Sequence, residues 1–316
     1  MKMLSFIVPC YNEEKNVLLF YKECLKSFKN YELKIEIIFI NDGSKDNTIS
    51  EIKKVVKKAK SFSVKCINFS RNFGKDAAVY AGLENASGDY VVVIDADLQQ
   101  KPELVKKMID VLEENDDIDE VCYYQDKRIE NKFISFLKSK FYSFITKVSD
   151  IDFVNGASDF RLFRRNVVEA MLSMCESNRF SKGIFSWMGF NIYYLPYTPE
   201  ERQNGTSSFN FIKLFKYAFN GIVSFSSYPI RLILYFGFLI TFLSFIYFAY
   251  FCIRLILNMS VFKYWVLFGL IFLLFGILFI SLGIVGIYIY NIHVETKCRP
   301  IYIKKELLVG GKVYEE

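Results

Sequence analysis

Two aspartates, Asp95 and Asp97, stand at the end of an apolar run and could together bind a metal ion. The stretch YVVVIDADLQQKPEL, residues 90–104, contains both of them. If the run is a β-strand, residues two apart point to the same side, so the two carboxylates can face one point. Mg²⁺ and Mn²⁺ prefer oxygen ligands and complete their shells with water and substrate phosphates. A D-x-D pair alone is equally typical of a solvated turn, so the elements around it decide its meaning.

Those elements alternate between a strand pattern and a helix pattern. Short β-branched runs predict strands at residues 4–10, 34–44, 63–70, 89–97 and 119–125. Helical spacing of apolar residues predicts helices at 13–28, 46–59, 75–86 and 102–115. Such alternation is typical of β-α-β units. We therefore expect an α/β fold of Rossmann-like type, a mainly parallel sheet with helices on both faces.

Polar residues follow three of the predicted strands. The first strand ends in PCYNEE, the second in NDGS and the fourth in DADLQ. In an open parallel sheet, ligands bind beyond the carboxyl ends of the strands, so these side chains should gather at a ligand site. A divalent cation would balance the negative charge that collects there. The chain contains neither G-x-G-x-x-G nor G-x-x-x-x-G-K-[ST], which argues against a dinucleotide dehydrogenase and a P-loop NTPase.

Composition restricts the function classes further. The net charge of +6, from 40 basic and 34 acidic residues, does not favour a nucleic-acid partner. None of the seven cysteines forms a C-x-x-C pair, so neither a disulfide framework nor a zinc site is expected and the compartment should be a reducing cytoplasm. The single histidine, His293, nearly excludes histidine-centred catalysis.

The last third of the chain has the pattern of a membrane domain. Apolar runs at residues 230–257 and 265–292 each exceed the ~20 residues needed to cross a bilayer core. A buried helical hairpin is the alternative. Basic residues cluster before the first run and after the second, which predicts a multi-pass inner-membrane protein with both termini in the cytoplasm. An amphipathic segment before the first run predicts an interfacial helix, with a core helix as the alternative. The expected organisation is a cytoplasmic globular domain (1–206), the interfacial helix (207–228), two transmembrane helices (229–292) and a cytoplasmic tail (293–316).

Five motifs, in this order along residues 4–230, resemble those of the family 2 glycosyltransferases of the GT-A fold. They read FIVPCYNEEKNV, FINDGSKDNT, SRNFGKDAAVYAGL, DADLQQKPEL and NGASDFRLFRRNV. More narrowly, the chain resembles polyprenyl-phosphate glycosyltransferases, namely the bacterial bactoprenol-phosphate glucosyltransferases and dolichol-phosphate mannosyltransferase. Two C-terminal spans match the bacterial type.

The resemblance implies a role for each matching position. The nucleotide sugar would contact Pro9, Tyr11, Asn12, Glu13, Asp42 and Asp95. The metal ion, Mg²⁺ or Mn²⁺, would bind Asp95 and Asp97, with Gln99 as a further ligand. The residues implied in the reaction itself are Asp97, Asp159 at the acceptor, and Arg202 at the leaving diphosphate. The acceptor phosphate would be bound by Arg128, Arg161 and Arg164.

These roles predict an inverting, metal-dependent glycosyltransferase that moves a hexose from a UDP-sugar to undecaprenyl phosphate at the membrane. A phosphate monoester with a second pKa of ~6 is largely ionised near neutral pH, so Asp159 should position a reactant more than it abstracts a proton. Other donors, GDP-mannose or UDP-GlcNAc, and a non-catalytic scaffold that binds nucleotide sugars are the alternatives. The resemblance also implies a homotetramer. Gln100 and Lys101 depart from the family pattern near the metal pair, and Ser208 departs from the mannosyl type.

Overall fold

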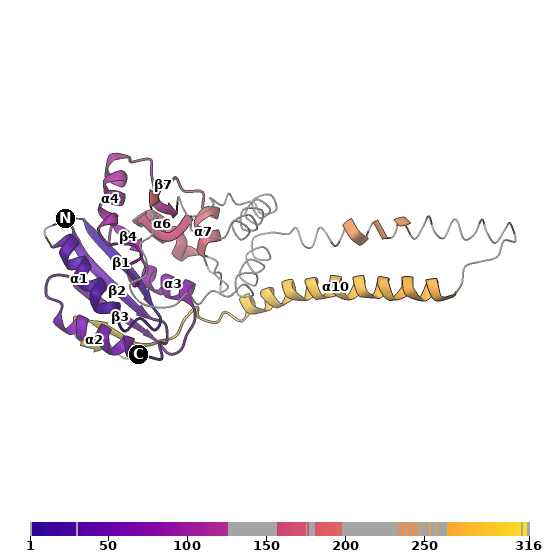
Figure 1. Cartoon of the computed structure of the whole chain (residues 1–316), viewed down its shortest axis with the longest axis horizontal. Coiled ribbons are helices and arrows are strands. Elements are labelled where there is room, and N and C mark those ends of the chain that lie inside the picture. Colours follow the sequence, from indigo (N-terminus) through magenta and orange to yellow (C-terminus); the bar gives the residue numbers. More distant parts are fainter. Residues whose placement is uncertain are drawn as a thin grey trace. The chain divides into compact units, whose positions relative to one another are not determined.

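The structure described here is a computed structural model. It describes residues 2–125 apart from 30, residues 157–197 apart from 175 and 177–180, scattered helical positions between 233 and 257, and residues 264–314 apart from 311. The chain divides into two compact units. The described residues of the first unit come from 2–125, 157–197 and 300–314, and those of the second lie between 233 and 299. Both ends of the chain therefore build the first unit (Figure 1).

A mixed sheet forms the centre of the first unit. In the described residues its strands are β1 (Met3–Cys10), β2 (Lys34–Asn41), β3 (Ser63–Phe69), β4 (Tyr90–Val93), β5 (Glu120–Gln125), β6 (Ala157–Arg164), β7 (Ile192–Tyr197), β8 (Lys304–Val309) and β9 (Lys312–Tyr314). Their order across the sheet is β7-β5-β6-β4-β1-β2-β3-β8-β9. The four central strands, β4, β1, β2 and β3, are parallel to one another. The mainly parallel centre agrees with the predicted α/β class.

The predicted strands and helices of the first 125 residues are all present. The helices of the first unit are α1 (Val17–Phe28), α2 (Thr48–Lys58), α3 (Lys75–Asn85), α4 (Leu104–Glu114), α6 (Arg165–Ser173) and α7 (Ser181–Trp187). The strand β6 was not predicted. It runs antiparallel to β4 and β5 and thereby extends the parallel centre into a mixed sheet.

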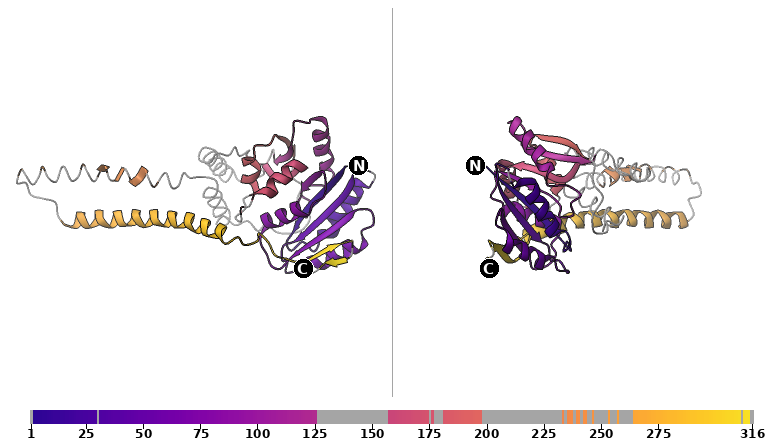
Figure 2. Two further views of the ribbon diagram at one scale, coloured as in Figure 1. Left: turned by 180° about the vertical axis from the view of Figure 1, so that it is seen from behind. Right: turned by 60° about the vertical axis from the view of Figure 1, so that its left-hand side comes forward.

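Helices cover both faces of the sheet, which explains why the central strands are apolar on both sides. Apolar residues of α1, α2 and α4 share one hydrophobic core with one face of the strands. Helix α3 packs on the opposite face, as the two views of Figures 1 and 2 show. A Cβ atom at Gly82 of α3 would lie 2.2 Å from the Cγ2 atom of Ile7, so this close approach requires glycine.

The C-terminal residues differ from the prediction of a tail at 293–316. Strand β8 pairs antiparallel with β3, and β9 pairs with β8. Leu308 of β8 is buried, and Glu306 forms an ion pair with Lys53 of α2 at 2.9 Å. This strand was not predicted because the short run KKELLV does not alternate clearly enough to indicate one. Its pairing depends on the free edge of β3, which lies more than two hundred residues earlier in the chain.

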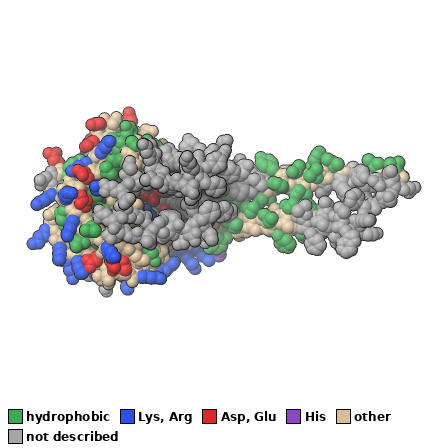
Figure 3. Space-filling view, viewed as in Figure 1, with side chains coloured by type: hydrophobic (Ala, Val, Ile, Leu, Met, Phe, Trp, Pro, Cys, Tyr) green, Lys and Arg blue, Asp and Glu red, His purple; other side chains and the backbone are tan. Residues whose placement is uncertain are grey.

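The second unit contains a long apolar helix, α10 (Tyr264–Thr296). Among the described helices it is the one long and apolar enough to cross a bilayer, and an 18-residue window within Leu274–Thr296 has a mean hydropathy of 2.0. Figure 3 shows hydrophobic side chains along the described part of this unit. The run predicted as a first span, residues 230–257, lies largely outside the described residues. The amphipathic helix predicted at 207–228 lies wholly outside them.

Candidate functional site

The carboxyl ends of β1 and β4 define the candidate site. The chain continues from β1 to β2 on one side, whereas β4 pairs with β1 on the other side. In open α/β sheets, ligands bind beyond the strand ends at such a reversal of strand order. Tyr11 follows β1, and Asp95 and Asp97 follow β4. The structure thus brings the first and fourth strand ends to one place, as the sequence predicted.

Lys75, the first residue of α3, joins two of the predicted acids. Its ammonium nitrogen lies 2.6 Å from Oδ1 of Asp95 and 3.1 Å from Oδ2 of Asp159. The strand register explains the meeting, because Val93 of β4 pairs with Arg161 of β6 and the register, continued by two residues, sets Asp159 opposite Asp95. All three side chains are partly exposed, by 43% for Lys75, 36% for Asp95 and 33% for Asp159. The group is therefore accessible to a ligand.

The charge state of Lys75 is set by competing effects. Burial disfavours the ammonium form, but the nearby carboxylates of Asp95 and Asp159 outweigh it, so the pKa of Lys75 is raised. Lys75 is therefore positively charged over the whole physiological range. The motif SRNFGKDAAVYAGL contributes to the family resemblance, but no role was predicted for its lysine. Its position in the chain could have indicated a role. A residue that begins a helix after a parallel strand lies at the same edge of the sheet as the strand ends.

The second acid of the pair, Asp97, belongs to a tight turn. Its Oδ1 atom accepts a hydrogen bond from the backbone N–H of Gln99 at 3.1 Å. The residue between them, Leu98, has a left-handed φ of 57°, which is rare for a branched side chain and occurs often at functional sites. Asp97 and Gln99 are both partly exposed. The turn thus presents polar atoms of the D-x-D motif at the rim.

The donor set suits Mg²⁺ or Mn²⁺ that shares its shell with a substrate. Asp95 and Asp97 supply carboxylates two residues apart, and Lys75 already places a positive charge against one of them. The described residues contain no group of three or more His, Cys, Asp or Glu side chains that could hold a metal by themselves. Mg²⁺ commonly uses one or two carboxylates and takes its other ligands from phosphates and water, so two carboxylates are sufficient.

Asp42 has a different environment from the one expected for a nucleoside ligand. It is 4% exposed, and its carboxylate accepts hydrogen bonds from the backbone N–H of Phe73 at 2.6 Å and of Gly74 at 3.0 Å. The side-chain amide of Asn72 donates a third bond at 2.9 Å. Burial raises the pKa of Asp42, although the two backbone N–H groups oppose the shift. Its placement supports a positioning role, because Asp42 holds the loop that leads directly into Lys75.

The loop after β1 is tied to the loop after β2. Asn12 has a left-handed φ of 58°, and its Oδ1 atom accepts a hydrogen bond from the N–H of Lys45 at 2.9 Å. The N–H of Glu13 donates to the hydroxyl of Thr48 at 2.8 Å. Asn12 and Glu13 thus help to fix the loop that follows β1. Tyr11 is 44% exposed beside them and is free of the core, which suits an aromatic that contacts a ligand.

Pro9, also predicted to line the nucleotide-sugar site, lies within β1. It pairs with Ile40 of β2 one residue before the strand ends, and it is partly exposed. Pro9 therefore lies close to the carboxyl end of β1. Its contact with a ligand stays a prediction.

Two predicted acceptor-phosphate ligands do not face the site. Arg161 is 2% exposed, forms an ion pair with the buried Glu120 and stacks over the ring of Phe185 at 4.7 Å. Its pKa is raised because Glu120 outweighs the effect of burial. A side chain so enclosed cannot reach an incoming phosphate, so the expectation for Arg161 is corrected. The sequence could not separate this arginine from a ligand, since Glu120 is distant in the chain.

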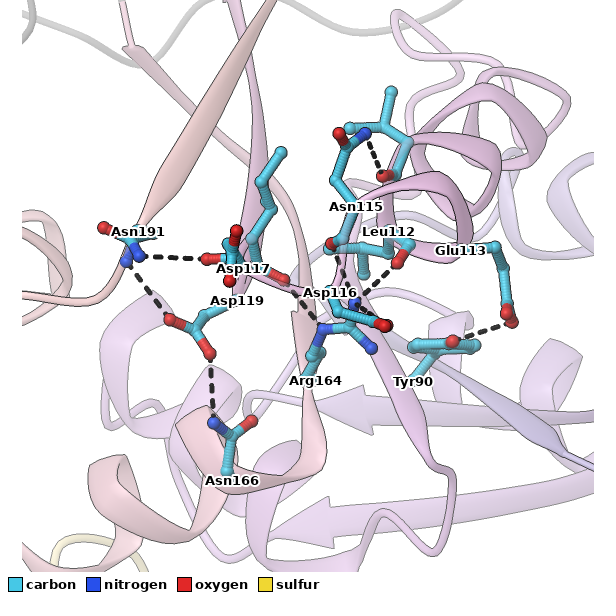
Figure 4. A network of polar contacts seen from close by, with 12 residues as sticks. Tyr90, Leu112, Glu113, Asn115, Asp116, Asp117, Asp119, Arg164, Asn166 and Asn191 are labelled. Atoms are coloured by element: carbon cyan, nitrogen blue, oxygen red, sulfur yellow. Dashed lines mark hydrogen bonds and ion pairs between the residues drawn. The ribbon is translucent and has the colours of Figure 1, made fainter.

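Arg164 lies at the opposite end of the same strands. It pairs with Tyr90, the first residue of β4, whereas Asp95 follows the last. Its guanidinium donates to the carbonyl oxygens of Leu112 at 2.5 Å and Asn115 at 3.1 Å, the arrangement that Figure 4 shows. Arg164 therefore secures the end of α4, and the acceptor-phosphate role is corrected here too. Arg128 and Arg202, the other predicted phosphate ligands, lie outside the described residues.

A comparison with known proteins identifies the class of enzyme to which this fold belongs. The chain belongs to glycosyl transferase family 2, whose family model matches residues 5–172. The predicted family, enzyme class and GT-A fold are thereby confirmed.

Several relatives match almost the whole chain. A provisionally named glycosyltransferase of Bacillus subtilis (strain 168), CsbB, is 42% identical over 311 residues, which cover 98% of this chain and 93% of that protein. The bactoprenol glucosyl transferase of Shigella phage SfV is 38% identical over 305 residues, covering 96% of this chain and 98% of that protein. Among solved structures, a mycobacterial protein resembles the fold with a TM-score of 0.50 at 15% identity, covering 70% of this chain and 73% of that one.

Proposed function

We propose that this protein transfers glucose from a UDP-sugar to undecaprenyl phosphate or a closely related polyprenyl phosphate. The observation that carries the proposal is the extent of the likeness to a bactoprenol glucosyl transferase. It spans 96% of this chain, so it includes the apolar C-terminal part as well as the sheet. A lipid-borne acceptor gives a reason for both parts in one protein, because the transfer site must meet a phosphate at the membrane surface.

On the donor side, Asp95 and Asp97 would hold Mg²⁺ or Mn²⁺ against the diphosphate of the nucleotide sugar. Gln99 stands beside them as a further candidate ligand. The ion would neutralise the negative charge that develops on the leaving nucleoside diphosphate. Tyr11, exposed at the end of β1, would stack on the base. The role of Arg202 at the leaving diphosphate comes from the family resemblance.

The transfer forms one bond and breaks one. An oxygen of the acceptor phosphate attacks the anomeric carbon of the sugar, and the bond between that carbon and the diphosphate oxygen breaks with inversion. The acceptor oxygen is already ionised near neutral pH, so no proton has to be removed. Asp159, paired with the charged Lys75, would orient a reactant. Arg128 is proposed for the acceptor phosphate on the family resemblance alone.

We further propose that the chain crosses the membrane an even number of times between residues 197 and 300. Residues before 197 and after 300 share one sheet, in which β8 pairs with β3. A domain built from both must lie on one side of the bilayer. If α10 crosses the membrane, a second crossing must precede it, and the apolar run 230–257 is long enough. The same argument supports both termini in the cytoplasm, where nucleotide sugars are made.

The decisive experiment supplies the purified protein in detergent with undecaprenyl phosphate, Mg²⁺ or Mn²⁺, and radiolabelled UDP-glucose, UDP-GlcNAc or GDP-mannose in separate reactions. We expect a glucosylated lipid from UDP-glucose alone. Product from another donor would reassign the sugar, and no lipid product from any donor with folded protein would refute the proposal.

Asp95→Asn separates an enzyme from a scaffold that merely binds nucleotide sugars. We expect turnover to fall at least about a hundredfold, which corresponds to ~2.7 kcal/mol of lost transition-state stabilisation. Asp110→Asn, on the exposed face of α4, is the matched control and should leave turnover unchanged. Equal activity of the Asp95 variant and the wild type would remove this carboxylate from the mechanism.

A further inference from the structure

Lys75 occupies a position between two acids that the proposed reaction uses differently. Asp95 belongs to the metal pair, whereas Asp159 is proposed to orient a reactant. Both carboxylates lie within 3.1 Å of one ammonium nitrogen. Two carboxylates this close to a common point would repel each other without a cation between them.

The position of Lys75 is fixed by specific contacts of the loop that precedes it. The loop before it is held by the buried carboxylate of Asp42, which accepts the N–H groups of Phe73 and Gly74. Phe73 packs edge-on against Phe69, whose ring stacks on Tyr302 at 4.8 Å. The start of α3 is thus fixed from two sides, by the end of β2 and by the segment that leads into β8.

We propose that Lys75 is a positioning residue that reserves Asp159 for the substrate by keeping it out of the metal shell. A divalent cation on Asp95 competes with the ammonium group for that carboxylate. As the cation binds, Lys75 keeps its second partner, Asp159, and holds that carboxylate at the acceptor side. This inference rests on the proposed metal use at Asp95.

The inference predicts opposite changes in two measurements. Without the positive charge of Lys75, the local potential at the two carboxylates is more negative, and Asp159 loses its ion pair with the ammonium group. We therefore expect Lys75→Met to bind Mn²⁺ more tightly, by about tenfold, since an opposite charge at this distance shifts ionic equilibria by an order of magnitude or more. The turnover number should fall by at least about tenfold, because a misdirected Asp159 no longer orients the reactants.

Mn²⁺ binding is titrated by electron paramagnetic resonance of free Mn²⁺ in the presence of saturating UDP, and turnover is measured as transfer to undecaprenyl phosphate. Lys75→Arg keeps the charge and should return the Mn²⁺ affinity close to that of the wild type. Lys53→Met is the matched control, because Lys53 also forms a 2.9 Å ion pair but with Glu306 of β8. It should leave both measurements unchanged. The thermal unfolding midpoint of each variant reports whether it is folded.

A purely structural lysine would lower both metal affinity and turnover, or neither. If folded Lys75→Met binds Mn²⁺ as the wild type does or more weakly, the inference is wrong, and the proposed function stands wherever the wild type makes lipid product. If the wild type makes product but binds no Mn²⁺ with UDP, the metal assignment and this inference both fail. If the wild type makes no lipid product yet Lys75→Met binds Mn²⁺ more tightly, the acceptor assignment fails and the role of Lys75 at the metal is retained.

Discussion

Asp42 and Asp95 are acids on the same rim, and the family resemblance implies that both contact the nucleotide sugar. Their surroundings distinguish them. Asp42 is buried and accepts three hydrogen bonds from one loop, whereas Asp95 is partly exposed beside Lys75. A buried acceptor that is already bonded holds structure, and a partly exposed carboxylate can bind a ligand. Both residues are aspartates that follow a parallel strand, so burial decides.

Asp42→Asn tests the positioning role. The amide keeps the size of the side chain but turns one acceptor oxygen into a donor that faces backbone N–H groups. We expect the free energy of unfolding to fall by roughly 1–3 kcal/mol, the cost of an unsatisfied buried group, and turnover to fall because the start of α3 shifts. Chemical denaturation and the transfer assay measure the two effects. Asp89→Asn is the control, since Asp89 also accepts a backbone N–H, that of Met3, but at the other end of the sheet. A loss of turnover at unchanged stability would instead indicate direct contact with the nucleotide.

At the scale of elements, one buried acid joins the amino ends of the central strands. Glu36 of β2 accepts hydrogen bonds from the hydroxyl of Ser5 on β1 and from the N–H of Ser87 just before β4, and it forms a 2.7 Å ion pair with Lys65 of β3. Burial would raise the pKa of Glu36, but these partners outweigh it and lower the pKa below its ordinary value of 4.5. The network secures the strands at the end of the sheet opposite the site.

The lowered pKa of Glu36 makes stability depend on pH in a defined direction. Since the folded-state pKa lies below the unfolded value, the ionised carboxylate stabilises the fold above pH 4.5, and this contribution is lost as the pH falls through the folded-state pKa. Glu36→Gln should cost roughly 1–3 kcal/mol at neutral pH and flatten the loss of stability below pH 4.5. Urea unfolding at a series of pH values measures both slopes. Parallel curves for variant and wild type would show that Glu36 does not carry the dependence.

Strand β8 is a second element whose contribution can be measured. Leu308 is 3% exposed and belongs to the core shared by α1, α2 and the strands. Leu308→Ala should lower the free energy of unfolding by about 2–4 kcal/mol, because it leaves a cavity. Ile303→Ala, at a position 52% exposed, should change it by less than ~0.5 kcal/mol. Thermal or urea unfolding in detergent compares them. If the two variants unfold alike, β8 does not pack on the sheet in solution.

For the whole molecule, the proposed even number of membrane crossings follows from a sheet that includes residues before 197 and after 300. Its closure by β8 means that the segment between 197 and 300 leaves the first unit and returns to it. Alkaline phosphatase, active outside the cytoplasm, should therefore be active when fused after residue 260 and inactive when fused after residue 316. Green fluorescent protein fusions should show the reverse pattern. An active phosphatase at both positions would mean an odd number of crossings and a sheet that cannot close.

Patterns within short segments of the sequence were sufficient to predict much of the fold of this protein. The alternation of strands and helices over the first 125 residues, the acids at the strand ends and the apolar length of α10 follow from side-chain periodicity and hydropathy, which are properties of short segments. Asp95 and Asp97 were identified in this way because residues two apart in a strand share a face.

Tertiary structure alone decided which of these groups meet. Lys75 became part of the site because α3 begins at the rim, and Asp159 because β6 runs antiparallel to β4. In the same register, Arg161 is buried beside Glu120, and Arg164 lies at the far end of the sheet. β8 joined the sheet because β3 offered an unpaired edge. Each of these outcomes depends on pairings between segments distant in the chain, and the free energy of such pairings is a property of both partners, so neither segment encodes it alone.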